Sequence, residues 1–243
     1  MSLQGASVLV TGGTRGIGRA IALRLVADGA SRAVLGYMRN DSAADEAAAL
    51  VQEAGAEAVL VRGNVADARV VDELAAAGPY RVVVHNAATG VIRPALETED
   101  KHWDWTLAAN ARALLSLARA TVPAMEKGGS ILAISSLGSQ RVLPNYVLIG
   151  VSKAALETCV KYLGVELAPR IRVNAVSGGV VDTEALDWFP NKEQMLASVK
   201  RTPAGRLVEP KDVAAAVSFL CSPDAAMVCG QTLIVDGGYS LGA

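Results

Sequence analysis

The feature that most constrains this chain is a glycine-rich turn near its beginning. Residues 11–18 read Thr-Gly-Gly-Thr-Arg-Gly-Ile-Gly, after the apolar run Ser7–Thr11 and before an apolar-periodic stretch from Ile17 to Gly29. Such a strand, turn and helix aim unpaired backbone N–H groups at an anion, and glycines let the backbone approach it closely. A glycine cluster alone is weak support, but this context predicts a bound dinucleotide.

Strand and helix patterns alternate along the whole chain. Seven short apolar runs are typical of buried strands, and stretches with a helical period separate them. This alternation predicts an α/β fold of the Rossmann type, a doubly wound seven-stranded parallel sheet with helices on both faces. The predicted strands are Ser7–Thr11, Ala33–Tyr37, Ala58–Val61, Arg81–His85, Ser130–Ser135, Arg172–Val176 and Thr232–Val235; the predicted helices are Ile17–Gly29, Asp41–Ala54, Asp67–Ala77, Asp100–Met125, Gly150–Ala168 and Lys211–Leu220.

Domain organisation can be inferred from the interruptions of this alternation. The 243 residues contain no internal repeat and no linker-like segment, so we expect one domain over residues 1–243. Residues 182–206 are less regular, and they are expected to form a substrate flap. In this flap Leu186, Trp188, Phe189 and Met195 can either line an acyl slot or cover the sheet edge.

Composition excludes several classes of partner. The formal net charge is −1 with no basic block, so neither nucleic acid nor an anionic membrane is expected to bind. No apolar run is long enough for a membrane span and no signal-peptide pattern opens the chain, so a cytoplasmic protein is expected. Three cysteines without C-x-x-C spacing and two histidines give no reason to expect a metal site.

The choice of dinucleotide depends on the residues directly after the second predicted strand. An NAD site offers a carboxylate there for the ribose 2′-hydroxyl, whereas an NADP site offers arginine. Residues 36–40 read Gly-Tyr-Met-Arg-Asn, so Arg39 is available and the first carboxylate is Asp41. Arg15 in the glycine turn can bind the same phosphate through charge-assisted bonds. The pattern favours NADPH, although both arginines can also be read as solvated surface groups.

Further motifs lie at the ends of later strands. Residues 85–88 read His-Asn-Ala-Ala, Ser136 ends the fifth strand, and Lys153 lies on the next helix. With the glycine turn, these motifs resemble the short-chain dehydrogenase/reductase family over essentially the whole chain, with His85 and Ala88 as departures. The resemblance implies cofactor contacts at Gly12, Thr14, Arg15, Gly16, Ile17, Gly18, Met38, Arg39, Asn64, Val65, Asn86, Ala87, Tyr146, Lys153 and Thr183.

The spacing between tyrosine and lysine departs from most of that family. The usual tyrosine stands four residues before the lysine, but here that position is Ile149, which has no proton to donate. Tyr146 stands seven residues before Lys153, and separations of four and seven return to nearly the same helical face. The longer spacing is a hallmark of enoyl-acyl-carrier-protein reductases within the superfamily. Further runs resemble the NADPH-dependent enoyl-acyl-carrier-protein reductases of type III. They include Val176-Ser-Gly-Gly179 and Thr202-Pro-Ala-Gly-Arg206.

This resemblance implies reduction of the C=C bond of a trans-2-enoyl thioester on an acyl carrier protein or coenzyme A. Tyr146 would stabilise the enolate. Lys153 would hold the nicotinamide ribose, and Ser136 and Asn110 are the other catalytic candidates. A homotetramer is also expected from the resemblance.

Other readings stay open at this point. Tyr146 can be a loop aromatic, Lys153 a solvated lysine, Ser136 a strand-end hydroxyl, and Asn110 the holder of a kink in the long helix. Two other functions remain: a ketoreductase or carbonyl reductase of a biosynthetic pathway, and a non-catalytic NADP(H)-binding sensor or scaffold. The sensor is the weaker reading, because it would lack the tyrosine or the lysine.

Overall fold

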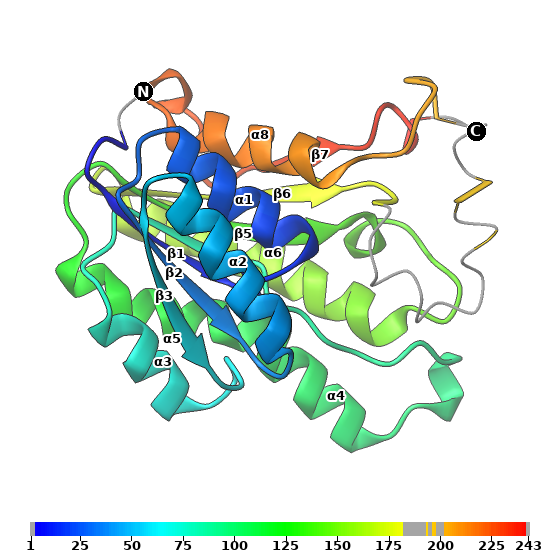
Figure 1. Cartoon of the computed structure of the whole chain (residues 1–243). Coiled ribbons are helices and arrows are strands. Elements are labelled where there is room, and N and C mark those ends of the chain that lie inside the picture. The colour runs from blue at the N-terminus through cyan, green and yellow to red at the C-terminus, as the bar shows by residue number, and fades with distance from the viewer. Residues whose placement is uncertain (1–2, 182–192, 194–195, 198–201, 242–243) are drawn as a thin grey trace.

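Parallel strands form the centre of the protein (Figure 1). The computed structural model describes residues 3–181, 193, 196–197 and 202–241. Within these residues the sheet has seven strands in the order β3-β2-β1-β4-β5-β6-β7, and every neighbouring pair is parallel. The strands are β1 (Ser7–Thr11), β2 (Arg32–Tyr37), β3 (Glu57–Arg62), β4 (Val82–His85), β5 (Gly129–Ser136), β6 (Ile171–Gly178) and β7 (Thr232–Val235).

Helices cover both faces of this sheet (Figure 1). Helices α1, α2 and α8 contribute to one apolar core, and α3, α5 and α6 contribute to the other. Helix α4 packs on α6 and so belongs to the second layer. The helices are α1 (Gly16–Ala27), α2 (Asp41–Glu53), α3 (Ala68–Ala76), α4 (Asp100–Leu107), α5 (Ala113–Thr121), α6 (Val147–Leu167) and α8 (Pro210–Cys221).

The apolar strands are continuous because both faces of the sheet are buried. On β1, Val8 and Val10 join the core beneath α1 and α8, whereas Leu9 joins the core beneath α5 and α6. Successive side chains on a strand point to opposite faces, so a strand covered on both sides is apolar at most of its positions. The predicted doubly wound α/β fold is therefore confirmed.

The predicted helix Asp100–Met125 is not continuous. A π-helical turn (Ala108–Arg112) separates α4 from α5, and a 3-10 turn (Val122–Ala124) ends the segment. A π-turn inserts one residue into the helical repeat and is frequent at functional sites. One inserted residue hardly changes the spacing of apolar residues over a stretch of 26. This explains why the sequence predicted an unbroken helix. Asn110 lies inside this turn.

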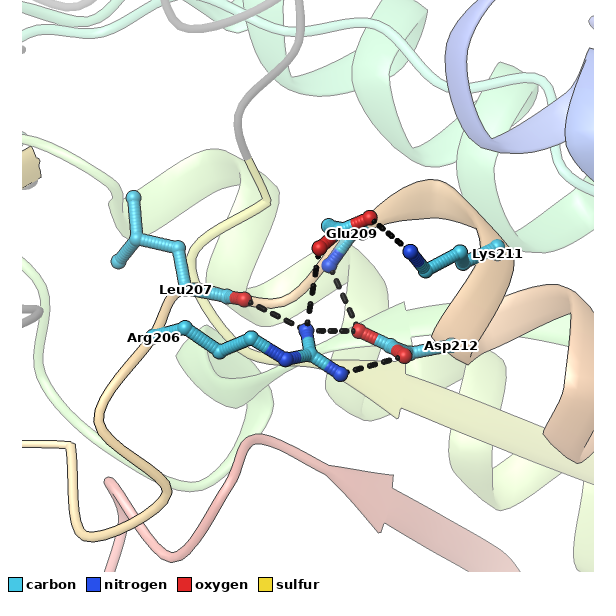
Figure 2. Close-up of polar contacts among 5 residues, drawn as sticks. All are labelled: Arg206, Leu207, Glu209, Lys211 and Asp212. Carbon is cyan, nitrogen blue, oxygen red and sulfur yellow. Dashed lines mark hydrogen bonds and ion pairs between the residues drawn. The ribbon is translucent and has the colours of Figure 1, made fainter.

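The chain is firmly held where it returns to α8 (Figure 2). Arg206 donates to both carboxylate oxygens of Asp212, at 2.6 and 2.9 Å, and to the carbonyl of Leu207 at 3.0 Å. Glu209 caps α8 in a reciprocal arrangement with Asp212, and Lys211 pairs with Glu209 at 2.6 Å. These contacts fix the end of the predicted flap, whose residues 182–192, 194–195 and 198–201 lie outside the described part of the chain.

Two further observations concern the described residues alone. No helix among them is both long and apolar enough to cross a membrane. No group of three or more His, Cys, Asp or Glu side chains among them is arranged to hold a metal ion.

Candidate active site

The candidate residues gather where the order of strands reverses. Strands β1 and β4 are neighbours in the sheet, although β2 and β3 separate them along the chain. In open α/β sheets, ligands bind outside the carboxyl ends of the strands at this kind of switch point. The glycine turn comes after β1, Asn86 and Ala87 come after β4, and Ser136 ends β5. The topology thus brings the predicted cofactor residues and the predicted catalytic residues to one edge.

The glycine turn has a shape that only glycines allow. Gly12 and Gly16 have φ angles of 62° and 51°, in the left-handed region that favours glycine. A Cβ on Gly18 would lie 2.0 Å from the carbonyl oxygen of Gly12. The first turn of α1 contains no acidic residue, and its N-cap, Arg15, makes no capping bond with its side chain. The N–H groups at this helix end are therefore suited to an anion such as a pyrophosphate.

The residues directly after β4 hold this turn in place. The Asn86 side chain donates from Nδ2 to the carbonyl of Thr11 at 3.1 Å and to that of Gly12 at 2.9 Å. The Thr11 hydroxyl accepts from the backbone N–H groups of Asn86 and Ala87, both at 3.1 Å. Asn86 thus contributes to the cofactor region first of all by fixing its backbone.

The hydrogen bonds of Thr11 also indicate which ring nitrogen of His85 carries the proton. With its oxygen accepting twice, the Thr11 hydroxyl donates to Nδ1 of His85, at 3.2 Å. Nε2 of His85 then carries the proton and donates to the backbone carbonyl of Asn110 at 3.3 Å. Burial, and secondarily the charge of Lys153, lower the pKa of His85 to about 4. His85 is therefore a neutral link between the glycine turn and the π-turn, and it is not placed to be a general base.

Other predicted cofactor contacts come after β2 and β3, at the same edge of the sheet. Met38 and Arg39 come directly after β2, and both are exposed, as is Arg15. The Asn64 side chain accepts a bond from the N–H of Ala66 at 3.0 Å, which shapes the loop after β3, and the neighbouring Val65 is buried. Thr183 lies outside the described residues.

Tyr146 approaches the end of β5 from the start of α6. It is the N-cap residue of that helix, and its hydroxyl donates to Oγ of Ser136 at 3.3 Å. Gly138 makes room for the ring, because a Cβ there would lie 2.5 Å from two of its carbons. Burial raises the pKa of Tyr146, and the bond to Ser136 partly opposes that rise. Tyr146 is therefore a protonated donor at neutral pH.

Lys153 lies on the buried face of α6. Only 5% of the residue is exposed, and Nζ donates to the carbonyl of Ile134 at 2.7 Å. Burial lowers the pKa of Lys153 to about 8, and the negative charge of Glu157 opposes that fall. The ammonium has two further N–H donors, and no hydrogen bond from them to a described residue is observed. These donors suit vicinal hydroxyls such as those of a ribose.

Ile149 stands where most of the family has its tyrosine. Its Cγ1 would lie 2.4 Å from a Cβ on Gly90, so the side chain packs directly over that glycine. Thr106 of α4 also lies near the same glycine. An aliphatic group thus fills this position, and the hydroxyls of Tyr146 and Ser136 lie at the end of β5.

The side chain of Asn110 is engaged within the protein. Its Oδ1 accepts from the N–H of Thr89 at 2.8 Å, and its Nδ2 donates to the carbonyl of Thr89 at 2.8 Å and to the hydroxyl of Ser152 at 2.9 Å. Both amide donors are therefore used. Asn110 joins the loop after β4 to helix α6, which is a positioning task.

One residue of this site was missed by sequence reasoning. Glu157 is a buried carboxylate one turn after Lys153, and it accepts hydrogen bonds from the segment that carries Ser136. The signal was present in the sequence, because an acidic residue stands four positions after the lysine among the apolar residues of α6.

Comparisons with known proteins agree with this geometry. A solved short-chain dehydrogenase from Burkholderia cenocepacia in complex with NADP has a TM-score of 0.90 and 31% identity over 99% of this chain and 100% of that one. The chain belongs to the short-chain dehydrogenase/reductase superfamily and is an oxidoreductase. Within it, residues 12–240 match the family described as enoyl-(acyl carrier protein) reductase.

Two curated relatives show how far chemistry varies among similar sequences. The 1-cyclohexenylcarbonyl-CoA reductase of Streptomyces collinus is 38% identical over 96% of this chain and 86% of its own length. The L-xylulose reductase of Mesocricetus auratus is 36% identical over 98% of both chains. The first name denotes a thioester with a conjugated C=C bond and the second a ketose, so identity at this level does not define the substrate.

Proposed function

We propose that this protein reduces the C=C bond of a trans-2-enoyl thioester with NADPH. The observation that carries the proposal is the position of Tyr146: its hydroxyl lies at Ser136, while the place four residues before Lys153 is filled by Ile149. The relative from Streptomyces collinus, whose name denotes an unsaturated coenzyme A thioester, supports this substrate class. The acyl group can be carried by coenzyme A or by an acyl carrier protein.

The residues of the cofactor region fit NADPH, which supplies the hydride when bound. The cradle at Gly12 and Gly18, where a Cβ would collide with the Asn86 amide and with the Gly12 carbonyl respectively, would receive the pyrophosphate at the N-terminus of α1. Arg15 and Arg39 bind the 2′-phosphate. The remaining donors of Lys153 bind the nicotinamide ribose. Asn64 and Val65 border the adenine, and Thr183 completes the predicted set.

Tyr146 carries the chemistry on the substrate side. When the β-carbon of the enoyl group gains a hydride, negative charge develops on the thioester oxygen. The Tyr146 hydroxyl, protonated at neutral pH, then donates its one hydrogen bond to that oxygen instead of to Oγ of Ser136. The buried ammonium of Lys153 stabilises the same charge electrostatically. Proton transfer to the α-carbon, from Tyr146 or from water, then completes the reduction.

A substrate assay tests this proposal directly. Purified protein is mixed with NADPH and either crotonyl or longer enoyl thioesters or the matching 3-ketoacyl thioesters, and loss of NADPH absorbance is monitored. We expect kcat/KM for the enoyl series to exceed that for the keto series. Turnover of the keto series alone contradicts the proposal.

The second candidate is a ketoreductase or carbonyl reductase, which the similarity to L-xylulose reductase supports. Tyr146 would then protonate the carbonyl oxygen of a ketone in place of stabilising a thioester enolate. The keto arm of the assay identifies this function, and a protein that binds NADPH but turns over neither series is the non-catalytic binder. The expected homotetramer is tested separately by light scattering of the purified protein.

A further inference from the structure

We propose that Glu157 is a positioning residue that holds both Tyr146 and Lys153 ready for reaction, acting as a brace for the turn beneath the tyrosine and as the counter-charge for the lysine. The proposal rests on the proposed use of Tyr146 and Lys153. The side-chain hydrogen bonds of Glu157 to described residues all go to residues 135–140, so it would act through Tyr146 and Lys153.

The first observation is that the Glu157 carboxylate is buried and accepts several hydrogen bonds. Only 8% of the residue is exposed, yet Oε1 accepts from the hydroxyl of Ser135 at 2.5 Å and from that of Ser139 at 2.6 Å. Oε2 accepts from the Gln140 amide at 3.5 Å. A buried carboxylate is unfavourable unless such bonds compensate it, so its presence points to a task beyond packing.

These partners enclose the segment that meets Tyr146. Ser135 and Ser139 stand on either side of Ser136, which accepts the tyrosine hydroxyl, and of Gly138, which lies against the ring. Glu157 thus fixes both ends of the short turn on which Tyr146 rests. The carboxylate belongs to α6, whose N-cap is Tyr146, so one helix holds the ring and the turn that receives it.

The second observation is the relation of Glu157 to Lys153. The two residues are one helical turn apart, and they bind consecutive residues of β5: Lys153 donates to the carbonyl of Ile134, and Glu157 accepts from Ser135. The Glu157 charge raises the pKa of Lys153 against the larger effect of burial. His85 of β4 also interacts with this ammonium, and it is neutral near pH 7.

The pH dependence of NADPH binding separates charge from packing. NADPH fluorescence is titrated with wild-type protein and with Glu157→Gln, without any thioester. Loss of the Lys153 proton should weaken binding, and removal of the carboxylate should move that alkaline break to lower pH by about one unit. The same displacement is expected in kcat/KM for NADPH with whichever thioester the enzyme reduces.

Matched variants isolate the two tasks. Ser139→Ala keeps the charge but removes one brace, so it should lower kcat several-fold at every pH and leave the alkaline break in place. Glu157→Asp keeps the charge and should also leave the break near its wild-type position. Glu166→Gln removes an exposed carboxylate from the same helix and should change neither quantity.

The outcomes decide between a positioning role and a structural one. If Glu157→Gln lowers the melting temperature but moves the break in neither measurement, Glu157 serves the fold alone and the proposal is overturned. If Glu157→Gln fails to fold, Glu157→Asp and Ser139→Ala still test the proposal. A shift of the alkaline break in NADPH binding in either variant would contradict the proposal. The binding titration needs no enoyl substrate, so failure of the proposed reaction is detected separately.

Discussion

The candidate active site has two halves, one before β5 and one formed by β5 and α6, and they differ in the kinds of groups that form them. The half before β5 is made of backbone and small residues, with Gly12, Gly18 and the amide of Asn86 shaping a cradle. The half formed by β5 and α6 contains buried charge, with Lys153 and Glu157 bound to consecutive residues of one strand. A cradle of backbone serves every member of a dinucleotide-binding family, whereas buried charges can be arranged for one reaction. Apart from the ribose contact proposed for Lys153, the first half should therefore govern binding of the dinucleotide and the second half turnover.

The largest effect should come from Tyr146→Phe. This change removes the donor to the thioester oxygen while Gly138 still accommodates the ring, so we expect kcat to fall about 1000-fold. The dissociation constant of NADPH, measured by fluorescence, should stay within about twofold. Tyr162→Phe is the control, because Tyr162 lies exposed on the same helix. Wild-type turnover by Tyr146→Phe would remove the tyrosine from the mechanism and break the division between the halves.

The next largest effect should be on the pH dependence of folding stability, and the variant Lys153→Met in the half formed by β5 and α6 tests it. The pKa of Lys153 falls from 10.5 to about 8 on folding. Below pH 8 both states hold the proton, so the folded state bears the full penalty of a buried ammonium. Between pH 8 and 10.5 only the unfolded chain is protonated, so stability rises with pH.

Relative to Lys153→Met, the wild type should therefore gain stability over that range, by on the order of 3 kcal/mol. Melting temperatures of both proteins, recorded from neutral to alkaline pH, measure this gain, while turnover of the variant should collapse. Lys161→Met, at an exposed position of α6, should show no such divergence. Parallel curves for wild type and Lys153→Met would mean that the ammonium is well solvated.

The cradle half is tested by Gly18→Ala. The added methyl would lie 2.0 Å from the carbonyl oxygen of Gly12, so the turn must shift where the pyrophosphate is expected. We expect NADPH affinity to fall at least about tenfold. Gly55→Ala is the matched control, because it strains a residue with φ of 89° but meets nothing within 4 Å. It should lower stability and leave NADPH affinity unchanged.

The same division explains which features the sequence could predict. Residue type and order are sufficient for the alternating strands, the glycine turn and the seven-residue step from Tyr146 to Lys153. They are insufficient for the π-turn at Asn110, because one inserted residue hardly changes an apolar period. They also fail for the partners of His85 and Glu157, since a buried polar group is satisfied by residues far away in the chain. Thr11 and His85, for example, are 74 positions apart.

The smallest effect should be on the choice between cofactors. Arg39 lies just after β2 and is exposed, so its bond to a 2′-phosphate would compete with water and be screened by salt. We therefore expect Arg39→Ala to weaken NADPH binding only about tenfold and to leave NADH binding within about twofold. Fluorescence titrations with both cofactors at low and moderate salt measure the difference, which should shrink as salt rises.

Arg62→Ala provides the control for this change, because Arg62 is an exposed arginine at the end of β3 whose partner is Asp41. If Arg39→Ala lowered the affinity for NADPH and for NADH equally, Arg39 would be a general surface charge. Arg15 would then remain as the ligand of the 2′-phosphate. Selectivity would then reside inside the glycine turn itself, and the backbone half of the site would carry specificity as well as binding.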